Sequence, residues 1–380
     1  MNSFIPVCEP EIGEQEKKYV NECLDTGWIS SSGRFIDEFE SKWAKYCNRK
    51  YGIAVCNGTA ALQIAVKALG IGPGDEVILP AFTIISCALA IIYNGGIPVL
   101  VDSDPDTWTI SVKDIENKIT EKTKAIMAVH IYGHPADMDP VIRLAKKYKL
   151  AVIEDAAEAH GALYQADRKS SSPKWKPCGS MGTVSIFSFY ANKPITTGEG
   201  GMVLTDDSKR AEKIRSLRNL CFLPERRFFH NEAGFNFRIT NIQAALGLAQ
   251  LERIKEIIIK KRWIGQEYTK RLKDIKLLQL PVEKSWAKNI YWMYGIVISE
   301  KSNINAFRFA ELLKDKGIET RPFFLGMHEQ GVFRKMGLFL NQKYPVCERL
   351  SKKGLYLPSG LALNERQITY ISDVIHRILP

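Results

Sequence analysis

Short apolar segments alternate with amphipathic ones between Tyr51 and about Asp206. Helical patterns lie between the apolar segments, as in the run that Thr59 opens and at Asp139-Pro140, an N-cap followed by proline at the first helical position. This alternation predicts an α/β core with helices on both faces of a mostly parallel sheet. The length and β-branched content of the apolar segments predict strands near residues 52–56, 76–79, 98–102, 125–131, 151–154, 184–189 and 201–205.

The pattern changes after Thr240. Residues 241–274 carry apolar positions at helical spacing over many turns, which predicts one long helix. Mixed patterns follow, including the strand-like YGIVIS and an amphipathic stretch over residues 305–315. We therefore expect a large α/β domain over residues 1–250 and a smaller C-terminal α+β domain over residues 251–380.

Composition excludes several classes of protein. With 45% hydrophobic and 25% charged residues, the chain is typical of globular proteins. Its apolar runs are far shorter than the roughly 20 residues of a membrane helix, and its opening residues lack a signal-peptide pattern, so we expect no membrane partner and a cytoplasmic location. The eight cysteines form no C-x-x-C pair, which argues against a zinc site and a disulfide framework.

The formal net charge of +11 raises the question of a nucleic-acid partner. Basic residues cluster only in short runs such as Lys260-Lys261-Arg262, and a diffuse positive field suits a small anionic substrate equally well. We expect no nucleic-acid partner.

Lys193 follows an apolar strand pattern and lies in a glycine-bearing loop, within SIFSFYANKPITTGEGG. A lysine removed from water has a lowered pKa and supplies the free amine that forms an imine with an aldehyde cofactor. The alternative is a solvated surface lysine.

Asp155 belongs to a second informative segment, LAVIEDAAEAHGA, in which an apolar strand ends in the acids Glu154 and Asp155. In open α/β sheets, ligands bind beyond the carboxyl ends of the strands, so we expect Asp155 to face the same crevice as Lys193. An aspartate beside a pyridine nitrogen keeps that nitrogen protonated, and the protonated ring then stores the electron pair of a carbanion. Alternatively, Asp155 only caps a turn.

The segment VCNGTAALQIAVKALG combines a strand, a turn and a helix. The backbone N–H groups at a helix start bind anions, and glycine lets a phosphate approach closely. Gly58 and Thr59 are therefore candidate phosphate contacts, and Ser188 could add a hydroxyl. A plain helix cap is the alternative.

Together these segments resemble the DegT/DnrJ/EryC1/StrS family of sugar aminotransferases, which have the fold-type I fold of aspartate aminotransferase and use pyridoxal 5'-phosphate. The likeness spans nearly the whole chain. It includes IPVCEPEIGEQEKKYVNECLDTGWISSSG, VCNGTAALQIA, LPAFTIISCALAI, VHIYGHPADMD, EDAAEAHG, SFYANKPITTGEGG and FNFRITNIQAALGLAQLE.

The resemblance implies roles for single residues. Lys193 matches the Schiff-base lysine, Asp155 the partner of the pyridine nitrogen, and Glu158 the position beside the ring hydroxyl of the cofactor. It implies a phosphate cradle made of Gly58, Thr59 and Ser188.

Asn236, in FNFRITN, matches a residue that reaches the phosphate from the neighbouring subunit, so the resemblance implies a homodimer with shared active sites. Ile84 departs from the family pattern, because many relatives stack an aromatic ring on the cofactor at this position. A related subgroup has histidine in place of Lys193 and dehydrates its sugar, so the lysine favours amino transfer.

The implied reaction moves the amino group of L-glutamate to a nucleotide-linked keto sugar, with pyridoxamine phosphate as the intermediate cofactor form. The segments LPAFTII, VDSDPDTW, ITTGEGG and ETRPFFLGMHEQ look most like enzymes that aminate C4 of GDP-4-keto-6-deoxymannose to give GDP-perosamine. Enzymes for UDP- or dTDP-linked 3- or 4-keto-6-deoxy sugars share most of these motifs.

For the sugar nucleotide, the resemblance points to Trp28, Ser32, Arg321 and His328. Trp28 could equally be a core aromatic and Arg321 a surface ion-pair residue. The His328-Glu329 pair lacks the second histidine of H-E-x-x-H, so we expect no metal. A regulatory or binding protein that keeps the fold without the reaction is the rival from another class.

Overall fold

A seven-stranded sheet forms the centre of the computed structural model, which describes residues 4–168, 172–223 and 225–379. The strand order is β1-β9-β8-β5-β4-β2-β3. β9 runs antiparallel to both of its neighbours, and the remaining adjacent pairs are parallel. The strands are β1 (Tyr51–Val55), β2 (Glu76–Pro80), β3 (Ile97–Val101), β4 (Thr123–Val129), β5 (Ala151–Asp155), β8 (Val184–Ser188) and β9 (Gly201–Thr205).

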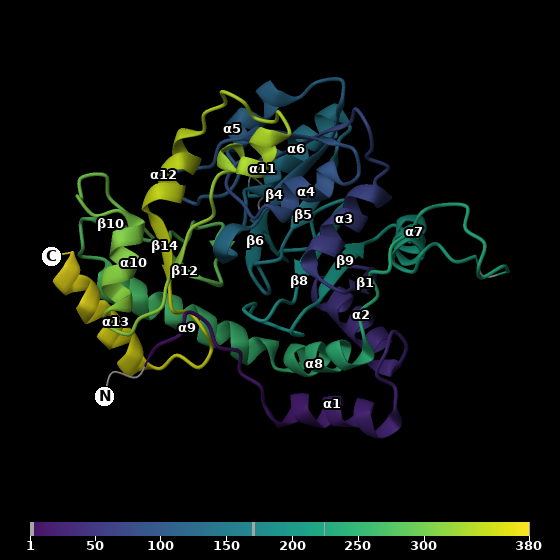
Figure 1. The fold of residues 1–380 in the computed structure, drawn as a ribbon, viewed down its shortest axis with the longest axis horizontal. Helices are drawn as coiled ribbons and strands as arrows, with labels where there is room; N and C mark the ends of the chain where they lie inside the picture. The colour runs from purple at the N-terminus through teal and green to yellow at the C-terminus, as the bar shows by residue number, and fades with distance from the viewer. Residues whose placement is uncertain (1–3, 169–171, 224, 380) are drawn as a thin grey trace.

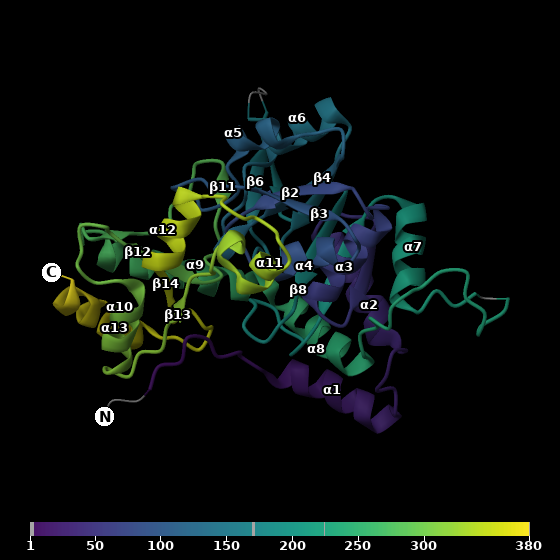
Figure 2. The ribbon, with the colours of Figure 1, turned by 45° about the horizontal axis from the view of Figure 1, so that its top comes forward.

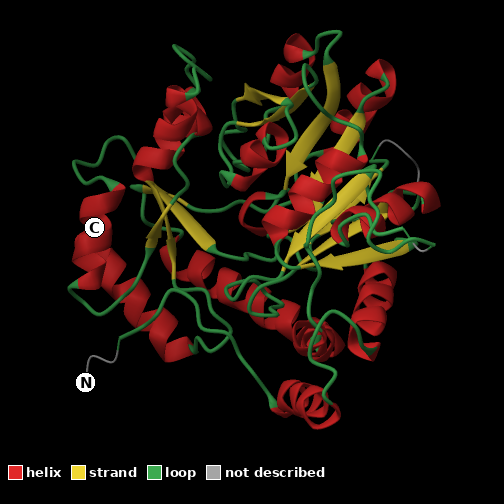
Figure 3. Cartoon of the chain, turned by 45° about the vertical axis from the view of Figure 1, so that its right-hand side comes forward, coloured by secondary structure: helices red, strands yellow, loops and turns green. Residues whose placement is uncertain are grey.

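Helices lie on both sides of this sheet (Figure 3). The alternation of residues along each strand explains why: on β2, Val77 and Leu79 join one buried cluster while Ile78 joins another, on the opposite face. The predicted α/β fold class is confirmed. The helices of this part are α1 (Glu14–Thr26), α2 (Arg34–Tyr46), α3 (Gly58–Ala68), α4 (Ser86–Ile92), α5 (Val112–Ile115), α6 (Met138–Tyr148), α7 (Ser208–Arg218) and α8 (Asn241–Glu252).

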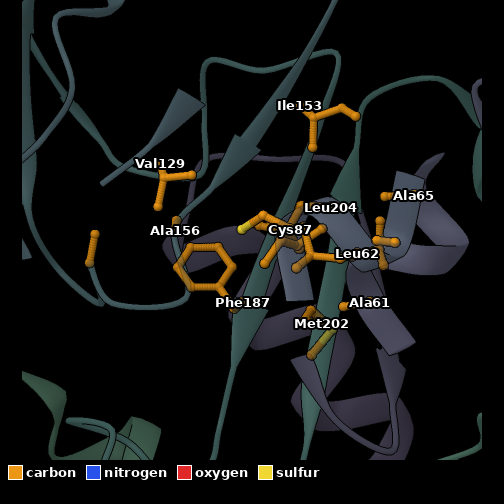
Figure 4. Close-up of a cluster of buried hydrophobic side chains, with 14 of the residues drawn as sticks. Ala61, Leu62, Ala65, Cys87, Val129, Ile153, Ala156, Phe187, Met202 and Leu204 are labelled. Carbon is orange, nitrogen blue, oxygen red and sulfur yellow. The ribbon is translucent and has the colours of Figure 1, made fainter. Parts of the chain in front are cut away.

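The larger core cluster packs α3 against the sheet (Figure 4). Ala61, Leu62 and Ala65 on α3 belong to this cluster, as do Ile186 of β8 and Val203 of β9. Phe187 faces the other side of the sheet and packs edge-on against Trp43 of α2 at 5.0 Å between ring centres. Two short alanines on this face let the helix lie close to the strands, which brings the first turn of α3 to the edge of the sheet.

The C-terminal part contains a smaller four-stranded sheet of order β10-β12-β14-β13. The predicted strand YGIVIS is β12 (Tyr294–Ile298), and the predicted amphipathic helix is α10 (Ala306–Lys314). The other elements of this part are β10 (Leu278–Gln279), β13 (Arg321–Pro322), β14 (Gly354–Leu357), α11 (Gly331–Lys335), α12 (Pro345–Lys353) and α13 (Glu365–Ile378). A separate three-stranded sheet joins the two parts of the chain. It consists of β6 (Leu163–Ala166) and β7 (Lys174–Pro177) together with β11 (Ala287–Lys288).

Two helix boundaries differ from prediction. The expected helix over residues 241–274 is two helices, α8 and α9 (Ile254–Leu272), because Arg253 between them has φ −108° and ψ 18°. α6 begins at Met138 with Asp137 as its N-cap, so Asp139 lies inside the first turn instead of capping it.

A division near residue 250 remains a proposal, and one segment crosses it. Ile5 packs in the cluster formed by residues 264–379, and its N–H donates to Gly317 O at 2.8 Å. Figures 1 and 2 show this N-terminal segment running beside the C-terminal part before it reaches α1. Within the described ranges, no helix is long and apolar enough to cross a membrane.

Candidate active site

A cavity of about 530 Å³ opens at the carboxyl edge of the seven-stranded sheet. It lies where β1, β4, β5 and β8 end, because Asn57, Val129, Asp155 and Ser188 all line it. The cavity also collects most residues that the sequence singled out for the cofactor: Gly58, Thr59, Ile84, Asp155, Glu158, Ser188 and Lys193.

Lys193 lies in the loop after β8, with its side chain only 10% exposed. Its Nζ is 3.7 Å from Glu158 Oε1 and 3.5 Å from the centre of the Trp292 ring. Burial lowers the pKa of Lys193, while the charges of Glu158 and Asp155 act in the opposite direction. The side chain is therefore removed from water, as the imine chemistry requires, and is not a solvated surface lysine.

The two acids at the end of β5 point to opposite faces of the sheet, as successive residues of a strand do. Glu154 faces away from the cavity, where it accepts hydrogen bonds from the backbone N–H groups of Gly179, Met181 and Gly182. It also lies 3.0 Å from His130 Nε2. Glu154 thus fixes a loop, and Asp155 alone faces the cavity.

Asp155 is held by two donors. The Ala157 N–H donates to its Oδ1 at 3.0 Å, and the Cys87 thiol donates to its Oδ2 at 3.3 Å. Burial raises the pKa of Asp155 above its ordinary value. A basic, oriented carboxylate of this kind can hold a proton on a ring nitrogen.

Glu158 accepts a hydrogen bond of 2.7 Å from the Tyr132 N–H, which leaves its other oxygen facing Lys193. Burial raises the pKa of Glu158 to about 7. Near neutral pH this carboxyl group can therefore either accept or donate a hydrogen bond.

The first turn of α3 and the end of β8 form a cradle. The Asn57 side chain caps α3 by accepting from the Ala60 N–H at 2.8 Å. A Cβ on Gly58 would lie 2.7 Å from Ser188 Cβ, so only glycine keeps this approach open. Thr59 and Ser86 share a hydrogen bond of 2.9 Å beside it. Backbone donors, hydroxyl groups and the helix dipole make this end of the cavity suited to a phosphate.

These residues fit pyridoxal 5'-phosphate. A buried amine, a carboxylate on a neighbouring strand and a phosphate cradle lie around one cavity of suitable size. Trp292, Phe324 and Tyr356 complete the wall from the C-terminal part, and sequence reasoning missed them. The only signal in the sequence was that Trp292 lies just before the predicted strand YGIVIS and Tyr356 lies in the apolar run GLYL. Such a position does not distinguish a residue of the cavity wall from a residue of the hydrophobic core.

The remaining predicted residues do not line this cavity. Asn236 is exposed on the segment between α7 and α8. Ser32 lines a second, larger cavity of about 680 Å³ together with Arg215, Arg227 and Arg238. Trp28 is 56% exposed, so the alternative that it is a core aromatic is wrong.

Arg321 and His328 also lie outside the cavity wall. Arg321 is exposed and forms an ion pair of 2.6 Å with Glu319, although β13 places it directly opposite Tyr356. His328 is buried, and its Nε2 lies 3.2 Å from Glu348 Oε1. In a single chain, these residues are not gathered around Lys193.

Residues 10–376 match the model of the DegT/DnrJ/EryC1/StrS aminotransferase family. The chain belongs to this family. Its membership confirms the resemblance seen in the sequence, the class of enzyme and pyridoxal phosphate as the cofactor.

Full-length relatives refine the placement within the DegT/DnrJ/EryC1/StrS family. The chain is 44% identical to the GDP-perosamine synthase of Escherichia coli O157:H7, over 98% of both chains. It is 42% identical to the GDP-perosamine synthase of Caulobacter vibrioides, over 99% of this chain and 98% of the relative. Among solved structures, DesV of S. venezuelae superposes with a TM-score of 0.90 at 30% identity, over 99% of each chain.

Proposed function

We propose that this enzyme transfers the amino group of L-glutamate to C4 of GDP-4-keto-6-deoxy-D-mannose, forming GDP-perosamine. The observation that carries the proposal is the full-length identity of 44% to a GDP-perosamine synthase, combined with a cavity that brings Lys193 and Asp155 together. When bound, the cofactor takes up the amino group and its ring stores the electron pair of the reacting carbon.

The residues of the chain divide the remaining work. Lys193 would hold the cofactor covalently, and its free amine would carry a proton to and from the reacting carbon. Asp155 would keep the ring nitrogen protonated, and Glu158, whose Oε1 is 3.7 Å from Lys193 Nζ, would face the ring hydroxyl. Gly58 and Ser188 bound the phosphate end. Burial of Lys193, Asp155 and Glu158 removes these three side chains from water, which strengthens the electrostatic contacts between them.

We propose a homodimer with shared active sites, in which Asn236 reaches the phosphate of the partner. The segment between α7 and α8, which carries Asn236, projects from the body of the molecule (Figure 1). Phe228 on this segment is 84% exposed and Phe229 is 44% exposed. Exposed phenylalanine side chains such as these two are expected where a second copy of the chain covers them.

A cytoplasmic location is supported by the state of the cysteines. All eight cysteines are free, and six of them are buried. Unpaired thiols are typical of proteins that work in a reducing compartment.

The test is a panel of GDP-, UDP- and dTDP-linked 4-keto-6-deoxy sugars, each incubated with the purified enzyme, pyridoxal phosphate and L-glutamate. Product masses are read by mass spectrometry, and NMR of the product locates the amine at C4 or C3. We expect amination of the GDP-linked sugar at C4 and none in the matched Lys193→Ala variant. If only UDP- or dTDP-linked sugars react, the assignment to GDP-perosamine is wrong while amino transfer stands.

A further inference from the structure

Lys261, on α9, is a buried cation that the proposed reaction does not use. Only 4% of the residue is exposed, and no carboxylate of the described residues lies within ion-pair distance of its ammonium group. Its Nζ donates instead to two backbone carbonyls, Trp292 O at 2.7 Å and Ser359 O. Buried lysines without a charged partner are rare, because desolvation of the ammonium group is costly. A specific role for this side chain is therefore expected.

The two carbonyls lie at the end of a strand pair. β12 and β14 pair antiparallel with Tyr294 opposite Leu357, so Trp292 and Ser359 each lie two residues beyond this last pair. The Tyr294 N–H donates to the Ser359 side chain at 2.9 Å. The Lys261 ammonium group thus bridges the two chain segments where the pairing of β12 and β14 ends, and it fixes the backbone at Trp292.

Trp292 in turn holds Lys193. The face of its indole lies 3.5 Å from Lys193 Nζ, measured to the ring centre. Its Nε1–H donates at 2.8 Å to the carbonyl of Asn192, the residue before Lys193. The ring is therefore tied to the lysine loop at one edge and to Lys261 through its backbone.

An aromatic face attracts an ammonium group far more than a neutral amine. Contact with Trp292 therefore favours the protonated form of Lys193 and opposes the effect of burial. The other titratable groups that face Lys193 come from β5 and the residues after it and from the N-terminal segment; they are Asp155, Glu158, His160 and Cys8.

We propose that Lys261 is a positioning residue that, through Trp292, keeps the proton affinity of Lys193 high enough for this lysine to take up a proton during amino transfer. The inference rests on the proposed role of Lys193 as proton carrier, but not on the identity of the sugar. Charge repulsion between the two lysines would act in the opposite direction, because removing Lys261 would then favour protonation of Lys193. The direction of the change therefore separates the two explanations.

The test measures the pKa of Lys193 itself in the full chain freed of cofactor. The rate of acetylation by acetic anhydride is followed at a series of pH values, and peptide mass spectrometry reports the modification of Lys193 alone. In Trp292→Leu and in Lys261→Met we expect the pKa of Lys193 to fall by about 1.5 units, the size of a desolvated cation–π contact. In the double variant, the pKa of Lys193 should fall no further than it does in Trp292→Leu. Lys255→Met, on the exposed side of α9, is the matched control and should leave the pKa unchanged.

An unchanged or raised pKa of Lys193 in Lys261→Met overturns the proposal, even if the melting temperature of that variant drops. Additive shifts in the double variant overturn the route through Trp292. If Lys261→Met does not fold, an unchanged pKa in Trp292→Leu is sufficient to reject the inference. Because no sugar enters this measurement, a failure of the sugar panel is distinguished from a failure of the Lys261 proposal.

Discussion

The Glu158 carboxylate lies 3.7 Å from the Lys193 ammonium group, and both side chains are almost wholly buried. Burial raises the pKa of Glu158 to about 7, even though the charge of Lys193 acts to lower it. The folded chain therefore binds a proton at Glu158 more tightly than the unfolded chain does. This stabilisation is complete below about pH 4.5, the ordinary pKa, and is lost as the pH rises through about 7.

Glu158→Gln should remove this pH dependence, because the amide imitates the protonated acid and still offers an oxygen to the Tyr132 N–H. Relative to the native chain, the variant should gain stability as the pH rises from about 4.5 to about 7, by up to about 3 kcal/mol. Urea unfolding of the cofactor-free proteins across this range measures the difference. Parallel stability curves for the two proteins would show that Glu158 does not titrate in this window.

Gly58→Ala should weaken cofactor binding without unfolding the chain. The added Cβ would meet Ser188 Cβ at 2.7 Å and would narrow the cradle at the first turn of α3. We expect the Kd for pyridoxal phosphate to rise at least about tenfold, a cost of about 1.4 kcal/mol. Gly331→Ala is the control, since a Cβ there meets no atom within 4 Å. Equal affinity of the two variants, measured by absorbance titration, would remove Gly58 from the phosphate site.

Ile84→Phe should tighten cofactor binding. Ile84 lines the cavity and is 38% exposed, so there is room for a larger side chain at this position. An aromatic ring over the cofactor adds about 0.5–1.5 kcal/mol, or roughly a two- to tenfold lower Kd. Ile84→Leu, which stays aliphatic, should leave the Kd unchanged. Weaker binding by Ile84→Phe would mean that this residue does not cover the cofactor ring.

Asp155→Asn should separate attachment of the cofactor from turnover. Lys193 is intact in this variant, so the cofactor still binds covalently, but the neutral amide no longer keeps the ring nitrogen protonated. We expect kcat to fall by about a hundredfold or more while the visible absorption of the bound cofactor persists. A variant with native kcat would show that Asp155 only caps the turn through Ala157.

The strands and the cofactor end of the site were predictable from the sequence because both are locally encoded. Each strand of the large sheet is a buried apolar run, and the chemistry lies where such a run ends, at Asp155 and Ser188. The break at Arg253 was missed because neither glycine nor proline marks it and the helical periodicity continues through it.

What the sequence could not reveal comes from distant segments. Trp292 and Tyr356 line the cavity although they lie about 100 and 160 residues after Lys193 in the chain, so their place in the wall depends on how the C-terminal part packs against the large sheet. Lys261 stands in the basic run Lys260-Lys261-Arg262, which is typical of a solvated helix face, yet it alone of the three is buried, because helical periodicity turns it toward the core. The proposed contact of Asn236 with the phosphate requires a second copy of the chain, and a single sequence contains no information on how two copies pack.

Lys193 is expected to bind pyridoxal phosphate covalently and to perform amino transfer. The direct test is to reduce the cofactor-loaded enzyme with sodium borohydride, which converts the bond between lysine and cofactor into a stable secondary amine, and then to locate the added pyridoxyl mass by peptide mass spectrometry. The mass is expected on the peptide that contains Lys193, and it should disappear when L-glutamate is added before the reductant. A pyridoxyl group on another lysine such as Lys261, or none at all, would show that Lys193 is not the residue that binds the cofactor.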